Sequence, residues 1–140
     1  MTINCNGRLI DLNEPKIMGI LNTTPNSFYD GGSNQSMNLI LEKVEKHLSE
    51  GADMIDIGGY STKPGAENIS EQEEIDRTAP IIEVIIKNHP ELIISIDTFR
   101  GNVAREAVKV GASIINDVSG WELDENMFDA IKELRVPYIL

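Results

Sequence analysis

Short apolar runs alternate along the chain with longer stretches in which apolar residues recur every three or four positions. The short runs are rich in Ile, Val, Leu and Met and cover residues 16–22, 54–59, 92–97, 113–118 and 137–140. They are apolar almost continuously, whereas a strand with one exposed face alternates apolar and polar residues. They therefore predict five strands that are buried on both faces, as in a parallel sheet covered by helices.

Four helices are predicted between these strands from apolar residues at helical spacing. The apolar positions are Met37, Ile40, Leu41, Val44 and Leu48; Ile75, Ala79, Ile82, Ile85 and Ile86; Val103, Ala107 and Val108; and Met127, Phe128, Ile131 and Leu134. Pro80 lies inside the second of these stripes. Because proline removes a backbone donor and crowds the preceding turn, we expect a kink or a break there.

Local signals mark where these helices begin and end. Ser70 and Glu73 form a capping-box pattern at the start of the second helix. Asp124 is a suitable N-cap for the fourth. Gly51 and Gly111 follow the first and third helices and are expected to stop them.

The remaining N-terminal segment predicts a small hairpin. The dipeptide Asn6-Gly7 separates two short apolar stretches within residues 3–13, a typical two-residue hairpin turn. We expect this hairpin to cover the bottom of the sheet, and we treat residues 1–140 as one domain. Four β/α units and the beginning of a fifth strand fit two architectures. One is the N-terminal part of a closed (β/α)8 barrel, which needs at least about 200 residues; the other is a complete open, doubly wound sheet.

Composition and charge limit the classes of partner and the cellular compartment that we expect for this chain. A formal net charge of −11 disfavours nucleic acid and anionic membrane surfaces as partners. No apolar run approaches the ~18 residues of a membrane span, and the N-terminus has no signal-peptide pattern. The single cysteine, Cys5, excludes an internal disulfide and is compatible with a reducing cytoplasm. We therefore expect a cytoplasmic protein that binds neither nucleic acid nor a membrane.

Polar side chains follow three of the predicted strands at the points where they end. Asn22 offers a carbonyl oxygen that suits Mg²⁺ or Ca²⁺, or else it closes a turn. The carboxylate of Asp97, expected to be buried, needs hydrogen-bond donors, and a heterocycle with adjacent N–H and amino groups would supply them. Asn116 could give the same ring a donor and an acceptor; alternatively, both residues cap the following helices. Asp56 and Asp117 are weaker candidates.

Two predicted loops could complete a site. Residues 23–32 are too long and polar for a tight turn and contain Phe28 and Tyr29, which could cover a ligand; an ordinary surface loop is the alternative. Residues 61–66 offer two hydroxyls, an ammonium group and a glycine, a set that can hold an anion. No His, Cys and Asp set has the spacing of a metal centre or an activated nucleophile, so covalent catalysis and zinc hydrolysis are not expected.

Three segments, residues 18–32, 53–66 and 95–120, match in order the signature blocks of a known family. Over residues 3–140 the chain resembles the dihydropteroate synthases. This resemblance implies a TIM barrel whose N-terminal four to five β/α units are present here, ending inside the fifth strand. It also implies a transferase of folate biosynthesis that uses Mg²⁺. Such an enzyme condenses 6-hydroxymethyl-7,8-dihydropterin pyrophosphate with p-aminobenzoate to give 7,8-dihydropteroate and pyrophosphate.

The resemblance assigns roles to single residues. Asn22 is expected at the metal and pyrophosphate, and it would act in catalysis together with Asp97. Thr62, Asp97 and Asn116 are expected to bind the pterin. Asp97 would also stabilise positive charge on the ring after pyrophosphate departs. No enzyme nucleophile is required, which agrees with the absence of one above.

Other family positions lie in the two loops. Phe28, Ser61, Lys63 and Pro64 are expected to close over the site and to help form the p-aminobenzoate pocket, where sulfonamide drugs compete in this family. Two residues depart from the family pattern: Asn26 stands where many members have aspartate, and Lys63 stands where arginine is usual. Lysine keeps the charge but loses the two-pronged hydrogen bond of arginine.

Two further functions stay open at this point. The chain could be a catalytically inactive pterin-binding half-barrel fragment, or a pterin methyltransferase with the same barrel. The two loops favour the synthase over the methyltransferase. We expect the 140-residue chain to be inactive by itself. The open edges of its first and fifth strands would invite aggregation or pairing with another copy, so a homodimer is one expected assembly.

Overall fold

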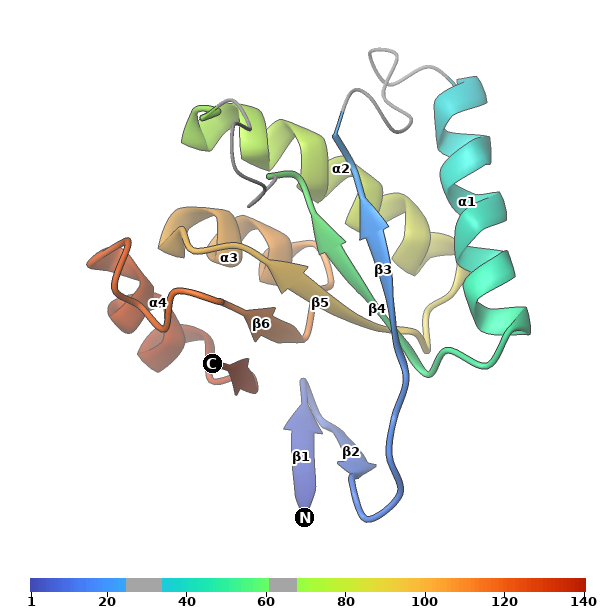
Figure 1. Ribbon diagram of the computed structural model, residues 1–140, viewed down its shortest axis with the longest axis horizontal. Helices are drawn as coiled ribbons and strands as arrows, with labels where there is room; N and C mark the ends of the chain where they lie inside the picture. Colours follow the sequence, from blue (N-terminus) through green and yellow to red (C-terminus); the bar gives the residue numbers. More distant parts are fainter. Residues whose placement is uncertain (25–33, 61–67) are drawn as a thin grey trace.

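The computed structural model describes residues 1–24, 34–60 and 68–140, without the side chains of Asn34 and Gln35. Within these residues a five-stranded parallel sheet is packed against four helices, and a separate hairpin lies at one end (Figure 1). The strands of the sheet are β3 (Met18–Asn22), β4 (Met54–Gly58), β5 (Ile93–Asp97), β6 (Ile114–Asn116) and β7 (Tyr138–Ile139). The helices are α1 (Asn34–Ser49), α2 (Glu71–Asn88), α3 (Gly101–Lys109) and α4 (Asn126–Leu134). All nine predicted elements are confirmed.

The strand order decides between the two architectures that periodicity left open. The strands pair in chain order, β3-β4-β5-β6-β7, and every pair is parallel. A doubly wound sheet would reverse this order once and carry helices on both faces. Instead, residues from all four helices share one buried core with Leu21, Ile57, Ile96 and Ile115 of the strands. The described strands and helices therefore form part of the wall of a β/α barrel, and the open doubly wound sheet is ruled out.

The predicted hairpin closes the N-terminal ends of the strands. β1 (Thr2–Cys5) pairs antiparallel with β2 (Arg8–Asp11) through a turn whose two residues have positive φ angles. The buried side chain of Cys5 packs against the first residues of β4, β5 and β6, in a small core of its own. Figure 1 shows the hairpin beyond the ends of the strands where they begin. The expected position at the bottom of the sheet is confirmed.

Helix α2 shows which local signals acted as predicted. Ser70 is its N-cap, and its Oγ accepts a hydrogen bond from the N–H of Glu73 at 3.1 Å. The carboxylate of Glu73 pairs with Arg77 at 2.6 Å. Of the kink or break expected at Pro80, the break is wrong, because α2 continues through Pro80 as one helix. Pro80 and Asp76 are both exposed, so water can bond the Asp76 carbonyl that loses its partner in the helix.

The start of α4 differs from the prediction. Glu125, not Asp124, is the N-cap residue, and its side chain makes no capping bond. The carboxylate of Asp124 instead accepts from the N–H of Asn126 at 3.0 Å and from the N–H of Gly101 at 2.8 Å. It thereby joins the first turns of α3 and α4. The two helices approach so closely that a Cβ on Gly101 would lie 2.6 Å from the carbonyl oxygen of Asn126.

Candidate functional site

Three of the predicted site residues lie at the carboxyl ends of their strands, on the face turned away from the helices. Asn22 ends β3, Asp97 ends β5 and Asn116 ends β6. Asp97 and Asn116 are partners in the ladder, and Asn22 is the partner of Gly58 on β4. A Cβ on Gly58 would lie 3.5 Å from Oδ2 of Asp97, so nothing bulky separates these residues. These residues lie at one level of the sheet, at the carboxyl ends of the strands, and we call this level the uppermost layer.

The carboxylate of Asp97 is half-buried, and none of the described residues donates a hydrogen bond to it. Burial first, and then the charges of Asp56, Glu74 and Asp117 in that order of importance, together raise its pKa from 3.8 to about 6. At neutral pH the group is therefore mostly ionised but has no donor among these residues. A ligand with N–H groups would supply the missing donors.

Asp56 of β4 lies one layer below Asp97 of β5, on the same face of the sheet. It is 5% exposed, and its Oδ2 accepts a hydrogen bond from Nδ2 of Asn116 at 3.2 Å. Its partner in the ladder is Ser95. Burial raises the pKa of Asp56, and the Ser95 hydroxyl and the Asn116 amide counteract that rise. Neither Oδ1 of Asp56 nor Oγ of Ser95 completes a hydrogen bond of ordinary geometry within the described structure.

A buried ionic network lies between α2 and the end of β5. Glu74 of α2 is completely buried; it accepts a hydrogen bond from the Thr98 hydroxyl and pairs with Arg100 at 3.0 Å. Arg100 also donates to the carbonyl of Ile69 at 2.7 Å. Burial raises the pKa of Glu74, although Thr98 and Arg100 lower it. The network holds the loop after β5 against the start of α2, next to Asp97.

Sequence reasoning missed Glu74, although a signal for it exists. The buried positions of α2 include Glu74, Thr78, Ile81 and Ile85, which recur at helical spacing. The predicted stripe began instead at Ile75, one residue further along. An acidic residue that continues a buried stripe of a helix is the pattern that would have indicated a buried ion pair.

The carboxylate of Asp117 is occupied by hydrogen bonds from neighbouring residues of the chain. It accepts from the N–H and the hydroxyl of Ser119, from the N–H of Trp121 and from the Tyr138 hydroxyl, at 2.7 to 2.9 Å. These bonds hold the loop after β6 in place. Burial first, and then the hydrogen bond and charge of Asp117, raise the pKa of Tyr138. The Trp121 ring stacks on Tyr138, with 6.2 Å between the ring centroids. Asp117 therefore shapes the wall of the site.

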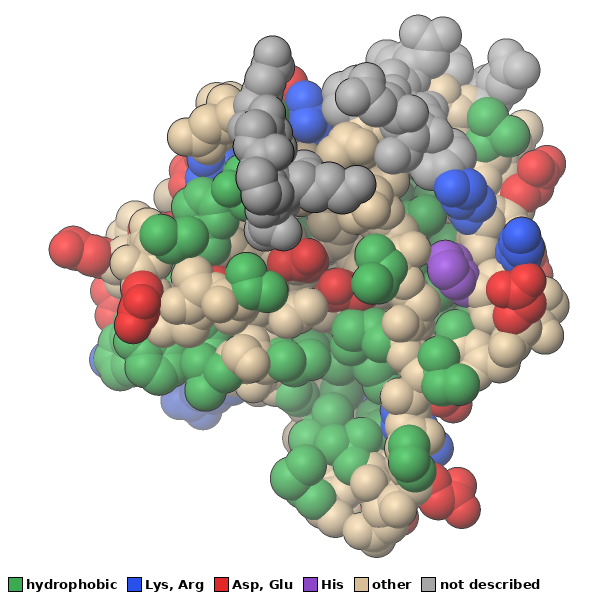
Figure 2. Space-filling view, in the orientation of Figure 1, with side chains coloured by type: hydrophobic (Ala, Val, Ile, Leu, Met, Phe, Trp, Pro, Cys, Tyr) green, Lys and Arg blue, Asp and Glu red, His purple; other side chains and the backbone are tan. Residues whose placement is uncertain are grey.

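The other predicted site residues are Phe28, Ser61, Thr62, Lys63 and Pro64, and all of them lie outside the described residues. The same holds for Asn26. Their roles, and the meeting of Thr62 with Asn22, Asp97 and Asn116, stay predictions. Figure 2 shows acidic side chains in the middle of the face on which the strands lie, as expected from the carboxylates on β4 and β5.

A metal ion would find few protein ligands at this site. In the described part of the chain no group of three or more His, Cys, Asp or Glu residues could hold one. The exposed amide of Asn22 offers a single carbonyl oxygen beside Asp97 and Asp56. This set suits Mg²⁺, which commonly keeps several waters and takes its other ligands from substrate phosphates.

No helix among the described residues is long and apolar enough to cross a membrane.

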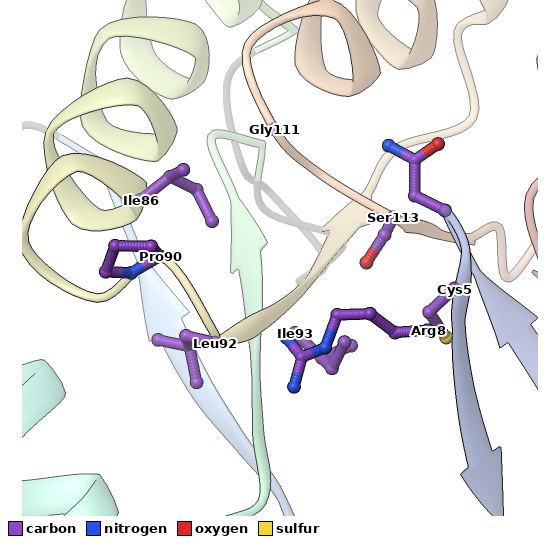
Figure 3. A pocket seen from close by; sticks show the side chains of 9 residues that line it. Cys5, Arg8, Ile86, Pro90, Leu92, Ile93, Gly111 and Ser113 are labelled. Atoms are coloured by element: carbon purple, nitrogen blue, oxygen red, sulfur yellow. The ribbon is translucent and has the colours of Figure 1, made fainter.

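Two hollows lie at the opposite, N-terminal end of the strands. The first, about 150 Å³, is lined by residues of the hairpin together with Ile86, Pro90 and Ser113 (Figure 3). Arg8 projects into it and donates a hydrogen bond to the carbonyl of Glu91. The second hollow, about 400 Å³ and wide open, lies beside the C-terminal end of α2. Both are separated from Asp97 by the length of the strands, so neither belongs to the site described above.

Known proteins resemble this chain in sequence and in structure. It is 50% identical over 127 residues to a folate synthesis bifunctional protein of Arabidopsis thaliana, which covers 89% of this chain and 26% of that protein. It is 49% identical over 124 residues to the dihydropteroate synthase of Bacillus subtilis, covering 89% of this chain and 43% of that protein. The chain thus spans half or less of the length of these relatives.

A solved structure supports the same relationship. The dihydropteroate synthase of Xanthomonas albilineans with 4-aminobenzoic acid superimposes with a TM-score of 0.89 and 41% identity, over 99% of this chain and 50% of that one. The fold class is therefore that of the dihydropteroate synthase barrel. The family model described as "Pterin binding enzyme" matches residues 18–140. The chain belongs to the family of pterin binding enzymes.

Proposed function

We propose that the protein is a dihydropteroate synthase, which condenses 6-hydroxymethyl-7,8-dihydropterin pyrophosphate with p-aminobenzoate and releases pyrophosphate. The observation that carries this proposal is the pair of Asp97 and Asn116, adjacent in the ladder at the carboxyl ends of β5 and β6. Their chemistry suits the amino and ring N–H groups of a pterin. The identity to dihydropteroate synthases adds support and favours this enzyme over a pterin methyltransferase.

The residues of the chain bind and orient the substrate, and none of them forms a covalent bond to it. The ionised carboxylate of Asp97 accepts hydrogen bonds from the ring and stabilises positive charge on it as the bond from the methylene carbon to pyrophosphate breaks. The arylamine nitrogen then bonds to that carbon and loses a proton. The half-buried position of Asp97 strengthens its interaction with the ring, because fewer water molecules screen it.

Mg²⁺ is part of the proposal. Asn22 would supply one oxygen ligand, and the pyrophosphate and water would supply the others. When bound, the ion would neutralise charge on the pyrophosphate and make it a better leaving group. The proposal is supported by the position of Asn22, which lies on the same face of the sheet as Asp97 and is separated from it by the strand that carries Gly58.

The finer predictions from the sequence belong to the same proposal. Phe28 and residues 61–64 would close over the substrates and form the p-aminobenzoate pocket, the target of sulfonamides. A cytoplasmic location and a homodimer also belong to the proposal, and Cys5, the single cysteine of residues 1–140, is compatible with a reducing compartment.

The test is turnover by the intact protein. With both substrates and Mg²⁺, we expect 7,8-dihydropteroate and pyrophosphate in equal amounts, and much less product after chelation of the metal. Asn22→Ala should raise the Mg²⁺ concentration needed for half-maximal rate. Asn88→Ala is a matched control, because Asn88 lies at the far end of α2 and bonds only the carbonyl of Val84 among the described residues. Failure of the unaltered protein to form product would refute the proposal.

A further inference from the structure

One buried carboxylate has no role in the proposed reaction as described above. Asp56 faces the interior of the sheet one layer below Asp97, and it is 5% exposed. A buried carboxylate is expensive unless it is paired with a cation or fully hydrogen-bonded. Asp56 has no cationic partner among the described residues, and its Oδ1 has no hydrogen bond there. Fold stability alone therefore does not explain a carboxylate at this position.

Besides its interaction with the Ser95 hydroxyl, Asp56 accepts a hydrogen bond that connects it to the candidate site. Nδ2 of Asn116 donates to Oδ2 of Asp56 at 3.2 Å, although the two residues lie 60 positions apart in the sequence. No other described residue bonds the side chain of Asn116. The link therefore runs from the buried layer directly to a residue of the uppermost layer.

This bond determines how the amide of Asn116 is turned. The two ends of an asparagine amide have almost the same shape, so packing alone distinguishes them poorly. In this contact Oδ2 of Asp56 is the acceptor, and the carboxyl group thereby selects the orientation in which Nδ2 of Asn116 faces Asp56. The Oδ1 atom and the second N–H of Asn116 then stay available to a ligand in a fixed order, beside the acceptor Asp97.

We propose that Asp56 is a positioning residue: its buried carboxylate holds the Asn116 amide in a single orientation and so makes the site selective for the 2-amino group of a pterin. This inference rests on the proposed function, in which the site binds a pterin. A ring with oxygen in place of the amino group, as in lumazine, offers an acceptor where pterin offers a donor. A fixed amide distinguishes the two, whereas a freely turning amide can adapt to either.

A double-mutant cycle on the intact protein tests this mechanism. The variants are Asp56→Asn, Asn116→Ala and the two combined, and calorimetry gives the dissociation constants of pterin and of lumazine for each. Asparagine at position 56 keeps the size but can donate or accept, so the amide of Asn116 is released. We expect Asp56→Asn to weaken pterin binding about tenfold, the scale seen for outer partners of binding residues, and to reduce the preference for pterin over lumazine. In the Asn116→Ala background the same change should have no further effect.

A matched control and a stability measurement separate this role from a structural one. Ser95→Ala removes a buried hydroxyl that interacts with Asp56 but does not bond Asn116; because the bond from Asn116 to Asp56 stays, pterin binding should change by less than about twofold. Urea unfolding shows whether each variant is folded. Independent effects of Asp56→Asn and Asn116→Ala on binding, or an unchanged preference for pterin in folded Asp56→Asn protein, would overturn the inference. If the unaltered protein binds no pterin, the proposed function itself is wrong.

Discussion

Replacing Asp97 with asparagine should stabilise the fold while weakening ligand binding. Burial first, and then the charges of Asp56, Glu74 and Asp117, raise the pKa of Asp97 from 3.8 to about 6. The unfolded chain restores the ordinary value. Between these two pH values the folded protein binds more protons than the unfolded chain, so the free energy of unfolding falls as the pH rises through this window. Asparagine cannot ionise and removes this pH dependence.

The size of the effect follows from the shift of about two pKa units. At 1.36 kcal/mol per unit the upper limit is about 3 kcal/mol. Asp97 ends its strand and is partly open to solvent, which screens part of the interaction. We therefore expect Asp97→Asn to raise the free energy of unfolding by about 1 to 3 kcal/mol near neutral pH and to have little effect below about pH 4. Binding of 7,8-dihydropteroate should weaken at least about tenfold, because hydrogen bonds to a charged acceptor are lost.

Urea unfolding near pH 7.5 and pH 4 measures the first effect, and calorimetry measures the second. Asp117→Asn is the control: Asp117 accepts four hydrogen bonds, and an amide cannot replace them all. That variant should lose stability at neutral pH. The reasoning fails if Asp97→Asn is no more stable than the unaltered protein near neutral pH, or if its gain is equally large at pH 4.

Two further predictions concern packing and the buried ion pair. Gly101→Ala should lower the free energy of unfolding by about 1 to 3 kcal/mol, because its Cβ would meet the backbone of Asn126 and the helices must move apart; an unchanged melting temperature would contradict this. Arg100→Met should cost about 3 to 5 kcal/mol, since it leaves the charge of buried Glu74 without its partner. Adding Glu74→Gln should recover much of that loss in urea unfolding, and no recovery would show that the ion pair is not the cause.

Much of the secondary structure could be predicted, because continuous apolar runs and helical stripes are local properties of the sequence. The ends of the elements were harder. The run 113–118 predicted a longer strand than β6 (Ile114–Asn116). β6 is shorter because the side chain of Asp117 bonds the following loop and the chain leaves the sheet there. The break expected at Pro80 did not occur, because the exposed side of α2 tolerates a missing hydrogen bond.

The arrangement of the strands and the contacts of the site needed the structure. A barrel and a doubly wound sheet share the same alternation of strands and helices, and only the strand order separates them. The positions of Asn22, Asp97 and Asn116 followed from the rule that strand ends in a parallel sheet share one edge. The bond between Asp56 and Asn116 could not be predicted, because it depends on the register of β4, β5 and β6.

The hairpin at the base of the strands gives the protein an internal reporter. Cys5, the single cysteine of residues 1–140, is the last residue of β1 in this hairpin and is 1% exposed; burial raises the pKa of its thiol, although Arg8 lowers it. A thiol reagent can reach the sulfur only when β1 and β2 separate from the ends of the other strands. The rate of labelling would therefore time the undocking of the hairpin without any engineered probe. Comparing the labelling rate with and without ligand would show whether ligand binding at the carboxyl ends of the strands changes how often the hairpin undocks at their opposite ends.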